Sequence, residues 1–340
     1  MLLAAIALAP LAACGTDTHQ NLNAVHAGFI AYLTGPNSVR DRGTLNLLAV
    51  GENSNQVIRD NISSNDFPSV TPAPGQLLVA DYSLDPPRLL LVDASSPHVT
   101  EVGTGRGPRL SGNGLFAYCD ARGRLVRSNV NDPHAVTIIY DLHAITSCPD
   151  IAWSNDGRLA FIAPRGSGPT SGNGLALYIS YEDSVRPIDL PTNITGYAAI
   201  SWSNDGRRVA VFADEVGIVY VDLENSGINV VDLPLRTQQS AFSPKSVTLL
   251  AAVSSRNGQT SLDVYENAQL VEELPLDTPT QFDAAFAWSP DGESIAVSTP
   301  HQLKAWKWRT GEESLALSKD PATDQRILPA LAWLSSETHT

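Results

Sequence analysis

The chain has 340 residues, of which 43% are hydrophobic and 17% are charged. This length allows either two ordinary domains or one large all-β domain, and a chain of this size can bury a large core. With 22 Lys and Arg residues against 36 Asp and Glu residues, the formal net charge is −14. Because an acidic surface repels phosphate backbones, this balance argues against nucleic acid as a partner.

The first predicted element is an apolar stretch at residues 2–13, interrupted only by Pro10. It is too short to cross a bilayer as a helix and has the length of the apolar region of a signal peptide. Its end, Leu-Ala-Ala-Cys at 11–14, resembles the lipobox of bacterial lipoproteins. The resemblance implies a signal peptide at 1–13, removed before Cys14, and acylation of Cys14 by palmitate or a similar chain.

A polar stretch at 14–24 follows and is expected to be a tether, so the protein would be anchored by lipid on the extracytoplasmic side of a bacterial envelope. Gly15 and Thr16 carry no charge, which favours the outer membrane in a host that has one. The departure from the lipoprotein pattern is that no basic residue precedes the apolar run. The alternative is a buried apolar segment with an ordinary core cysteine.

A repeat dominates the rest of the chain and is clearest in three segments, at 150–163, 199–213 and 285–298. Each contains Trp-Ser-Asn-Asp-Gly or Trp-Ser-Pro-Asp-Gly between two apolar stretches. Asp-Gly is typical of a two-residue hairpin turn in which both residues have positive φ. The repeat therefore predicts two strands joined by a tight turn, and its recurrent residues are expected to be structural rather than catalytic: Trp153, Asp156, Gly157, Trp202, Asp205, Gly206, Trp288, Asp291 and Gly292.

Weaker copies follow the same register and place Thr71, Leu110, Phe242 and Trp333 at the tryptophan position, at intervals of 39 to 49 residues. Two more strands follow in most copies, and four short strands per repeat make one blade of a β-propeller. In the last full copy, Trp306 lies in the expected third strand.

The ends of the repeat array predict how the ring closes. Three strands without a first one precede the copy at Thr71, and a first strand without followers lies at 327–335. Joined, they make one blade from both termini. We therefore expect an all-β, seven-bladed propeller of four-stranded antiparallel blades over residues 25–340, whose closure removes open sheet edges.

The segment Trp-Ser-Pro-Asp-Gly-Glu-Ser-Ile-Ala-Val-Ser at 288–298 resembles the repeat of TolB-like and WD-like bacterial propellers, Trp-Ser-Pro-Asp-Gly-x-x-Ile-Ala-Val-x-Ser. The resemblance spans nearly the whole chain after Cys14 and implies the propeller fold and a periplasmic setting. It implies little about activity, because propellers host many unrelated functions. TolB carries an additional α/β domain that has no counterpart here, so a role in the Tol system is not implied.

Two further cysteines fall in neighbouring blades. Cys119 ends the second strand of the third blade, and Cys148 precedes the first strand of the fourth. Loops after second strands and before first strands open on one face of a propeller, so we expect a disulfide, which an oxidising compartment allows. It would add roughly 3 kcal/mol of stability. The alternative is two small buried hydrophobic residues.

The sequence offers no catalytic, cofactor-binding or metal-binding constellation. None of the seven histidines has a metal-ligand spacing, and neither a Gly-x-Ser-x-Gly motif nor a phosphate-binding glycine loop is present. Arg106 and Arg109, in a loop that precedes a first strand, are the best candidates for contacting an anionic partner.

The favoured hypothesis is a lipid-anchored envelope protein that binds a protein partner as a scaffold, without catalysis or cofactor. The alternatives are a propeller enzyme of the lactonase or glycan-active hydrolase type, which would hold a metal in its central channel, and a sensor of a small ligand or peptide. In each case specificity is expected where the repeat is broken, at 104–110, 143–149 and 164–174.

Overall fold

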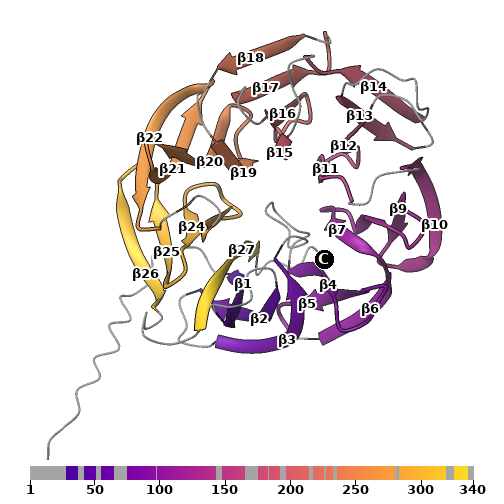
Figure 1. Ribbon diagram of the computed structural model, residues 1–340, viewed down its shortest axis with the longest axis horizontal. Coiled ribbons are helices and arrows are strands. Elements are labelled where there is room, and N and C mark those ends of the chain that lie inside the picture. Colours follow the sequence, from indigo (N-terminus) through magenta and orange to yellow (C-terminus); the bar gives the residue numbers. More distant parts are fainter. Residues whose placement is uncertain are drawn as a thin grey trace, which may run out of the picture.

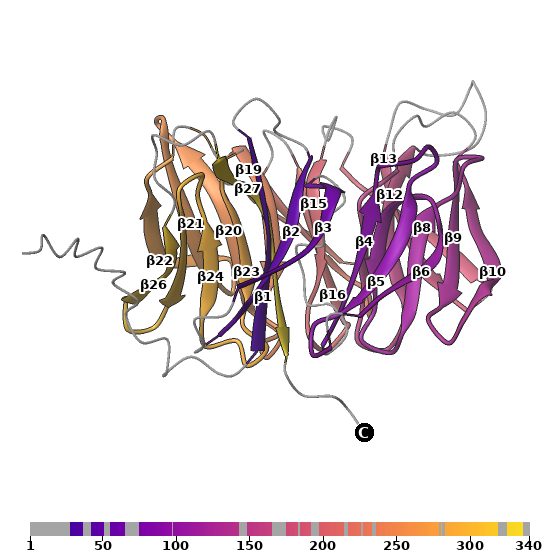
Figure 2. The same ribbon diagram turned by 90° about the horizontal axis from the view of Figure 1, so that it is seen from below.

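In the computed structural model, the described residues form twenty-seven β-strands, arranged as a ring of radial sheets around a central axis (Figure 1). Seen from the side, the ring is a short cylinder with loops on two faces (Figure 2). The structure describes residues 28–36, 42–50, 55–64, 75–96, 98–142, 148–164, 175–182, 184–191, 197–213, 217–225, 227–232, 236–278, 280, 283–318 and 325–335. None of these residues forms a helix that is long and apolar enough to cross a membrane.

The strands fall into seven groups, which we number as blades in chain order. Blade 1 holds β27 (Gln325–Ser335), β1 (Gly28–Pro36), β2 (Arg42–Ala49) and β3 (Asn55–Ser63), and blade 2 holds β4 (Gln76–Asp81), β5 (Arg88–Asp93) and β6 (His98–Thr104). Blade 3 holds β7 (Arg106–Leu110), β8 (Leu115–Cys119), β9 (Arg124–Asn129) and β10 (Asp132–Asp141). Blade 4 holds β11 (Ile151–Trp153), β12 (Leu159–Pro164), β13 (Leu175–Tyr181) and β14 (Ser184–Asp189).

The remaining three blades repeat the same antiparallel order from the axis to the rim. Blade 5 holds β15 (Tyr197–Trp202), β16 (Arg208–Ala213), β17 (Gly217–Asp222) and β18 (Ile228–Asp232). Blade 6 holds β19 (Arg236–Phe242), β20 (Leu249–Arg256), β21 (Gln259–Glu266) and β22 (Gln269–Leu276). Blade 7 holds β23 (Ala285–Trp288), β24 (Ile295–Ser298), β25 (Gln302–Lys307) and β26 (Glu312–Ser318).

The ring closes through both ends of the described chain, which confirms the predicted composite blade. β27 pairs antiparallel with β1, from Gly28 opposite Ser335 to Pro36 opposite Gln325, with one shift of register between Tyr32 and Thr34. Because β27 supplies the strand nearest the axis, blade 1 is complete only when the last described strand joins the first. In Figure 1 the yellow β27 lies beside the indigo β1.

Blades 1 and 2 share one sheet, which the repeat does not predict. The end of β3 pairs with β4 at a single position, Ile62 opposite Asp81. Arg59 of β3 and Arg88 of β5 both form ion pairs with the buried Asp81 carboxylate, at 2.8 and 3.0 Å. The predicted first strand of blade 2, around Thr71, lies outside the described residues. The seven strand groups are consistent with seven blades.

The hairpin turns of the repeat differ from the two-residue turns expected from Asp-Gly. Positive φ occurs at Gly157, Gly206 and Gly292, at 87°, 68° and 72°, but at none of the aspartates before them. In each turn the glycine N–H donates to the carbonyl of a serine three residues earlier, as Gly157 does to Ser154 at 3.2 Å. The turn is therefore a longer one, in which only the glycine is left-handed, and the expectation of positive φ at both residues is wrong.

The serine after each tryptophan position organises the turn. The Ser154 hydroxyl donates to Asp156, at 2.5 Å, and accepts the Arg158 N–H, at 2.9 Å. The same pairings recur in the equivalent turns of blades 5 and 7. These serines are almost inaccessible to solvent, and so are their counterparts in the weaker copies: Ser111, Ser154, Ser203, Ser243 and Ser289. Each satisfies buried backbone groups that the tight chain reversal would otherwise leave unpaired.

The recurring tryptophans join neighbouring blades. Trp202 donates its indole N–H to the Ala152 carbonyl of blade 4, at 2.9 Å, and Trp288 donates to Ala241 of blade 6, at 3.1 Å. Trp153 donates to Arg109 of blade 3 in the same way, at 2.9 Å. Each acceptor immediately precedes the tryptophan position of the preceding blade. Trp306 and Trp333 are also buried, so all five contribute to packing.

Side chains from the preceding blade also bond to the strand that lies nearest the axis in each of three blades. Such a strand has a free inner edge whose backbone groups need partners. Asp150 accepts the Ile200 N–H, and from the equivalent place the Gln239 amide bonds both the N–H and the carbonyl of Phe286. Two positions further along the repeat, Ser201 accepts the Phe242 N–H. These bonds tie blades 4 to 5, 5 to 6 and 6 to 7.

Candidate functional site

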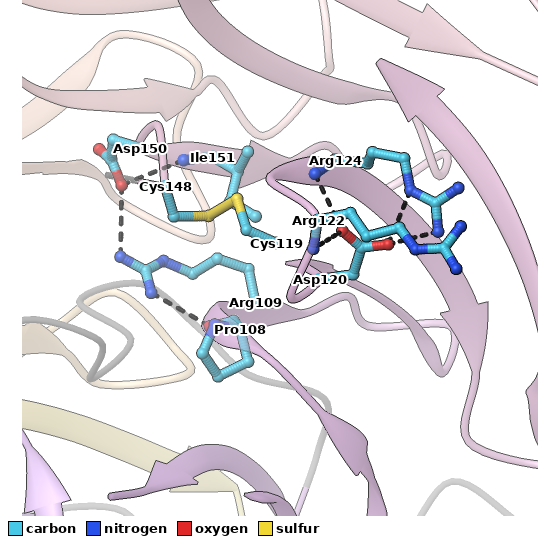
Figure 3. The surroundings of a disulfide bond; sticks show 9 residues. All are labelled: Pro108, Arg109, Cys119, Asp120, Arg122, Arg124, Cys148, Asp150 and Ile151. Atoms are coloured by element: carbon cyan, nitrogen blue, oxygen red, sulfur yellow. Dashed lines mark hydrogen bonds and ion pairs between the residues drawn. A yellow bond between two sulfur atoms is a disulfide. The ribbon is translucent and has the colours of Figure 1, made fainter. Parts of the chain in front are cut away.

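A disulfide joins two blades on one face of the ring. Cys119, the last residue of β8, is bonded to Cys148, which lies shortly before β11, with 5.7 Å between the Cα atoms (Figure 3). Cys119 is buried and Cys148 partly buried, in an apolar cluster that includes Leu125, Ile151 and Phe161. We call this side of the ring the disulfide face. The bond ties Cys148 to the end of β8 in blade 3, and we call the described residues around it, Gly107, Cys119 and Cys148, the platform.

Gly107 lies directly under the disulfide. Its φ is 60°, and a Cβ atom there would be 2.8 Å from the Cys148 Sγ atom. Only glycine fits both constraints, because other residues are strained at this φ and would collide with sulfur. The position coincides with a shift of register between Arg106 and Arg109 in the β7–β8 pair, so the strand bulges where the disulfide packs against it.

Arg109 and Asp150 connect three blades beside this bulge. Arg109 of β7 forms an ion pair with Asp150 at 3.3 Å, and it also donates to the Pro108 carbonyl (Figure 3). The other Asp150 oxygen accepts the Ile200 N–H of blade 5 at 3.0 Å. The pKa of Asp150 is raised because the effect of burial is larger than the opposing effects of the Arg109 charge and of the two backbone N–H groups. Arg109 is thus held in place by a carboxylate.

Three more arginines surround the platform, and with Arg109 we call them the arginine cluster: Arg106, Arg109, Arg122 and Arg124. Arg106 is about half exposed and reaches Asp85 of the blade 2 loop at 3.2 Å. Arg124 forms an ion pair with Asp120. The pKa of Asp120 is below its ordinary value, because hydrogen bonds from Arg124 and from the Arg122 backbone together outweigh the raising effect of burial. Arg122 is exposed, and no carboxylate of the described chain forms an ion pair with it.

The cluster is rich in arginine, but three of its four members already form ion pairs: Arg106 with Asp85, Arg109 with Asp150 and Arg124 with Asp120. Residues 102–131 contain five arginines and one aspartate, whereas the whole chain carries −14. The guanidinium groups offer planar pairs of donors that match carboxylates. Among the four, Arg122 is the guanidinium that is available to bind an anionic group of a partner.

The predicted site residues separate into two sets. Arg106 and Arg109 lie in the strand β7 itself, next to the disulfide between Cys119 and Cys148, so the expectation that they lie in a loop before a first strand is wrong. The repeat residues are distributed around the ring. Within the described ranges, no group of three or more His, Cys, Asp or Glu side chains is placed to hold a metal ion. Cys14, most of the loop at 143–149 and most of that at 164–174 lie outside the described residues.

Asp150 and Arg122 were not predicted from the sequence as parts of the site. Asp150 has a parallel in Asp283, which precedes β23 and forms an ion pair with Arg326 of β27 at 3.5 Å. In both cases an aspartate just before one first strand meets an arginine in the first strand of a neighbouring blade. An aspartate three to five residues before the repeat tryptophan is the signal that could have identified both.

No family model and no curated protein matches the sequence. Among solved structures, TolB from Acinetobacter baumannii is similar, with a TM-score of 0.52 and 16% identity over 74% of this chain and 64% of TolB. The β-propeller domain of the Trilobed protease from Pyrococcus furiosus has a TM-score of 0.59 and 11% identity, over 88% of this chain and 98% of that domain.

An oligogalacturonate lyase in complex with manganese is also similar, with a TM-score of 0.58 and 11% identity over 88% of this chain and 86% of the lyase. The chain thus has the β-propeller fold, which confirms the predicted fold class and the likeness to TolB-like propellers. Both TolB and several enzymes share this fold, so the likeness does not assign an activity.

Proposed function

We propose that this propeller is a non-catalytic scaffold that binds a protein partner in a bacterial cell envelope, where it is anchored by lipid on Cys14. The observation that carries the proposal is the arginine cluster, fixed on a disulfide-braced platform in a chain of net charge −14. The exposed Arg122 and the half-exposed Arg106 favour an anionic group on the partner, and the acidic remainder of the chain opposes non-specific association.

The disulfide supports the proposed location. Disulfides persist in oxidising compartments such as the periplasm and the cell surface. The lipobox-like sequence before Cys14 and the uncharged residues after it agree with an extracytoplasmic protein on the outer membrane. The likeness to the TolB fold supports the same compartment by analogy.

The scaffold is tested by crosslinking in native membranes, followed by mass spectrometry of the crosslinked proteins. We expect one dominant, stoichiometric partner, whose yield falls strongly when Arg106 and Arg122 are both changed to Glu. The matched control is Arg207→Glu, which reverses the charge of an exposed arginine in blade 5 and is expected to leave the yield unchanged. Absence of a dominant partner, or tight metal binding by the purified protein, would contradict the scaffold and favour an enzyme.

The anchor is tested separately with radiolabelled palmitate. The label is expected to enter the protein and to be absent from Cys14→Ala. If Cys14→Ala is labelled as strongly as the original protein, Cys14 is not the acylation site.

A further inference from the structure

Two hairpin tips in blade 6 have the same turn but differ in one residue. Asn257 and Gly258 join β20 to β21, and Asn267 and Ala268 join β21 to β22. All four residues have positive φ, between 50° and 81°, as in the two-residue turn in which both central residues are left-handed. Both asparagines are exposed, and a strand pair closes each tip directly beside them. The two tips therefore differ in the residue that follows the asparagine.

Asn257 meets the requirements for spontaneous deamidation. In this reaction the backbone nitrogen of the next residue attacks the side-chain amide, and glycine allows the attack most readily because it has no Cβ atom in the way. Among the described residues, neither the Asn257 side chain nor the Gly258 N–H has a hydrogen-bond partner. A Cβ atom at Gly258 would have no atom within 4 Å, so no packing opposes the movement that the attack needs.

A second Asn-Gly pair shows how the fold can protect an asparagine from the same reaction. Asn113 and Gly114 lie in the turn between β7 and β8. The Asn113 Oδ1 atom accepts the Ser111 hydroxyl at 2.5 Å and the Leu115 N–H at 3.4 Å. The Gly114 N–H donates to the Ser111 carbonyl at 3.3 Å. Both reacting groups are thus held in place and must first break these bonds. The third such pair, at 173–174, lies outside the described residues.

We propose that Asn257 is a site of spontaneous deamidation in the folded protein. The Gly258 nitrogen loses its proton to the solvent and forms a bond to the Cγ atom of Asn257. The bond from Cγ to Nδ2 then breaks and releases ammonia, which takes up a proton from the solvent. Water opens the resulting five-membered imide at one of its two carbonyl carbons. The products are aspartate, and isoaspartate, in which the main chain runs through the side-chain carbon.

The modification lies next to a buried polar network of blade 6. Asp263 is fully buried and accepts hydrogen bonds from the hydroxyls of Ser254, Ser261 and Tyr265, at 2.7 to 2.9 Å. Arg256, directly before the tip, forms an ion pair with Asp263 at 3.2 Å. Isoaspartate adds one atom to the main chain of the turn, so the strand pair that contains Arg256 cannot keep its register. Because a buried carboxylate that loses its cation is costly, the isoaspartate form should be less stable.

The site is tested by ageing the purified protein in mildly alkaline buffer and measuring amide loss at each asparagine by peptide mapping and mass spectrometry. Asn257 should react at least about tenfold faster than Asn113 and Asn267, which corresponds to about 1.4 kcal/mol of activation free energy. Ala268→Gly, which places glycine after the second asparagine, should raise the rate at Asn267 to that at Asn257. Gly258→Ala should lower the rate at Asn257 to that at Asn267, and Ala268 shows that this turn accepts alanine at a left-handed position.

Unfolding in urea separates the effect of the fold from that of the local sequence. There Asn113 and Asn257 should react at equal rates, because both are followed by glycine and neither keeps its turn. An isoaspartate-rich sample should also unfold at a lower temperature than Asn257→Asp, which gains the same charge without the extra main-chain atom. The inference is overturned if Asn113 reacts as fast as Asn257 in the folded protein, or if Ala268→Gly leaves the rate at Asn267 unchanged.

Discussion

The indole hydrogen bonds between blades can be isolated by making one substitution at two places. Trp202→Phe removes the N–H that donates to Ala152 across the blade 4–5 junction. Trp333→Phe makes the same chemical change at the equivalent repeat position of blade 1. There the indole nitrogen is buried and has no hydrogen-bond partner among the described residues. Both rings are buried, at 7% and 1% exposure, so the loss of ring volume is shared by the two variants.

The difference between the two variants should therefore report the hydrogen bond. A smaller ring costs roughly 1–2 kcal/mol in either place. Trp202→Phe also leaves the Ala152 carbonyl without its donor, which costs about 1–3 kcal/mol. It also weakens the contact of the ring with the Arg158 guanidinium, 5.0 Å from the ring centroid. Trp202→Phe should then be less stable than Trp333→Phe by about 2 kcal/mol.

Urea unfolding followed by far-ultraviolet circular dichroism measures this difference without relying on tryptophan fluorescence. For the roughly 250 described residues the entropy of unfolding is about 0.5 kcal/mol/K, so 2 kcal/mol corresponds to about 4 °C in Tm. Equal losses in the two variants would refute the reasoning. They would mean that the repeat tryptophans act by volume alone and that the bonds between blades contribute no net stability.

Three other predictions concern the platform and the joint between blades 1 and 2. Peptide mapping without reduction should recover a peptide in which Cys119 is linked to Cys148, and two free thiols would contradict the disulfide. Replacing both cysteines with Ala should cost about 3–4 kcal/mol of unfolding free energy, the value for a closed loop of this length. Gly107→Ala should lower Tm by several degrees, because a Cβ atom meets the Cys148 sulfur, and an unchanged Tm would show that the disulfide moves freely. At Asp81, burial alone would raise the pKa, but the Ser83 N–H and Arg59 lower it below its ordinary value. The ionised Asp81 carboxylate therefore stabilises the fold fully above about pH 4 to 5, and this stabilisation is lost as the pH falls through the lowered pKa. Asp81→Asn should cost roughly 3 kcal/mol of unfolding free energy at pH 7 and progressively less in acid. A loss that does not change with pH would contradict the ionic role of Asp81.

The fold could be predicted because the repeat encodes it redundantly. Trp153, Trp202 and Trp288 fixed the register, and the orphan strands at both ends required a composite blade, which the β1–β27 pairing confirms. The turn geometry was predicted less well. Asp-Gly suggested two left-handed residues, but the buried Ser154 hydroxyl holds Asp156 in a turn where only Gly157 has positive φ.

The candidate site could be predicted only in part, because its contacts join residues far apart in the sequence. The repeat placed Cys119 and Cys148 on one face, since that depends only on strand order. The pairing of Arg109 with Asp150, 41 residues away, depends on side-chain direction at a bulge that no local pattern specifies.

The closure of blade 1 has a consequence for the order of folding. Gly28 pairs with Ser335, so the contact that seals the ring has nearly the longest sequence separation in the chain, and contacts of this kind form slowly. β27 is the last described strand to leave the ribosome. Until it docks, β1 has an exposed inner edge that invites mispairing. Blades 3 to 7 can assemble from neighbours in sequence, whereas blade 1 must wait for the whole chain, so this seam is where a chaperone would be needed most.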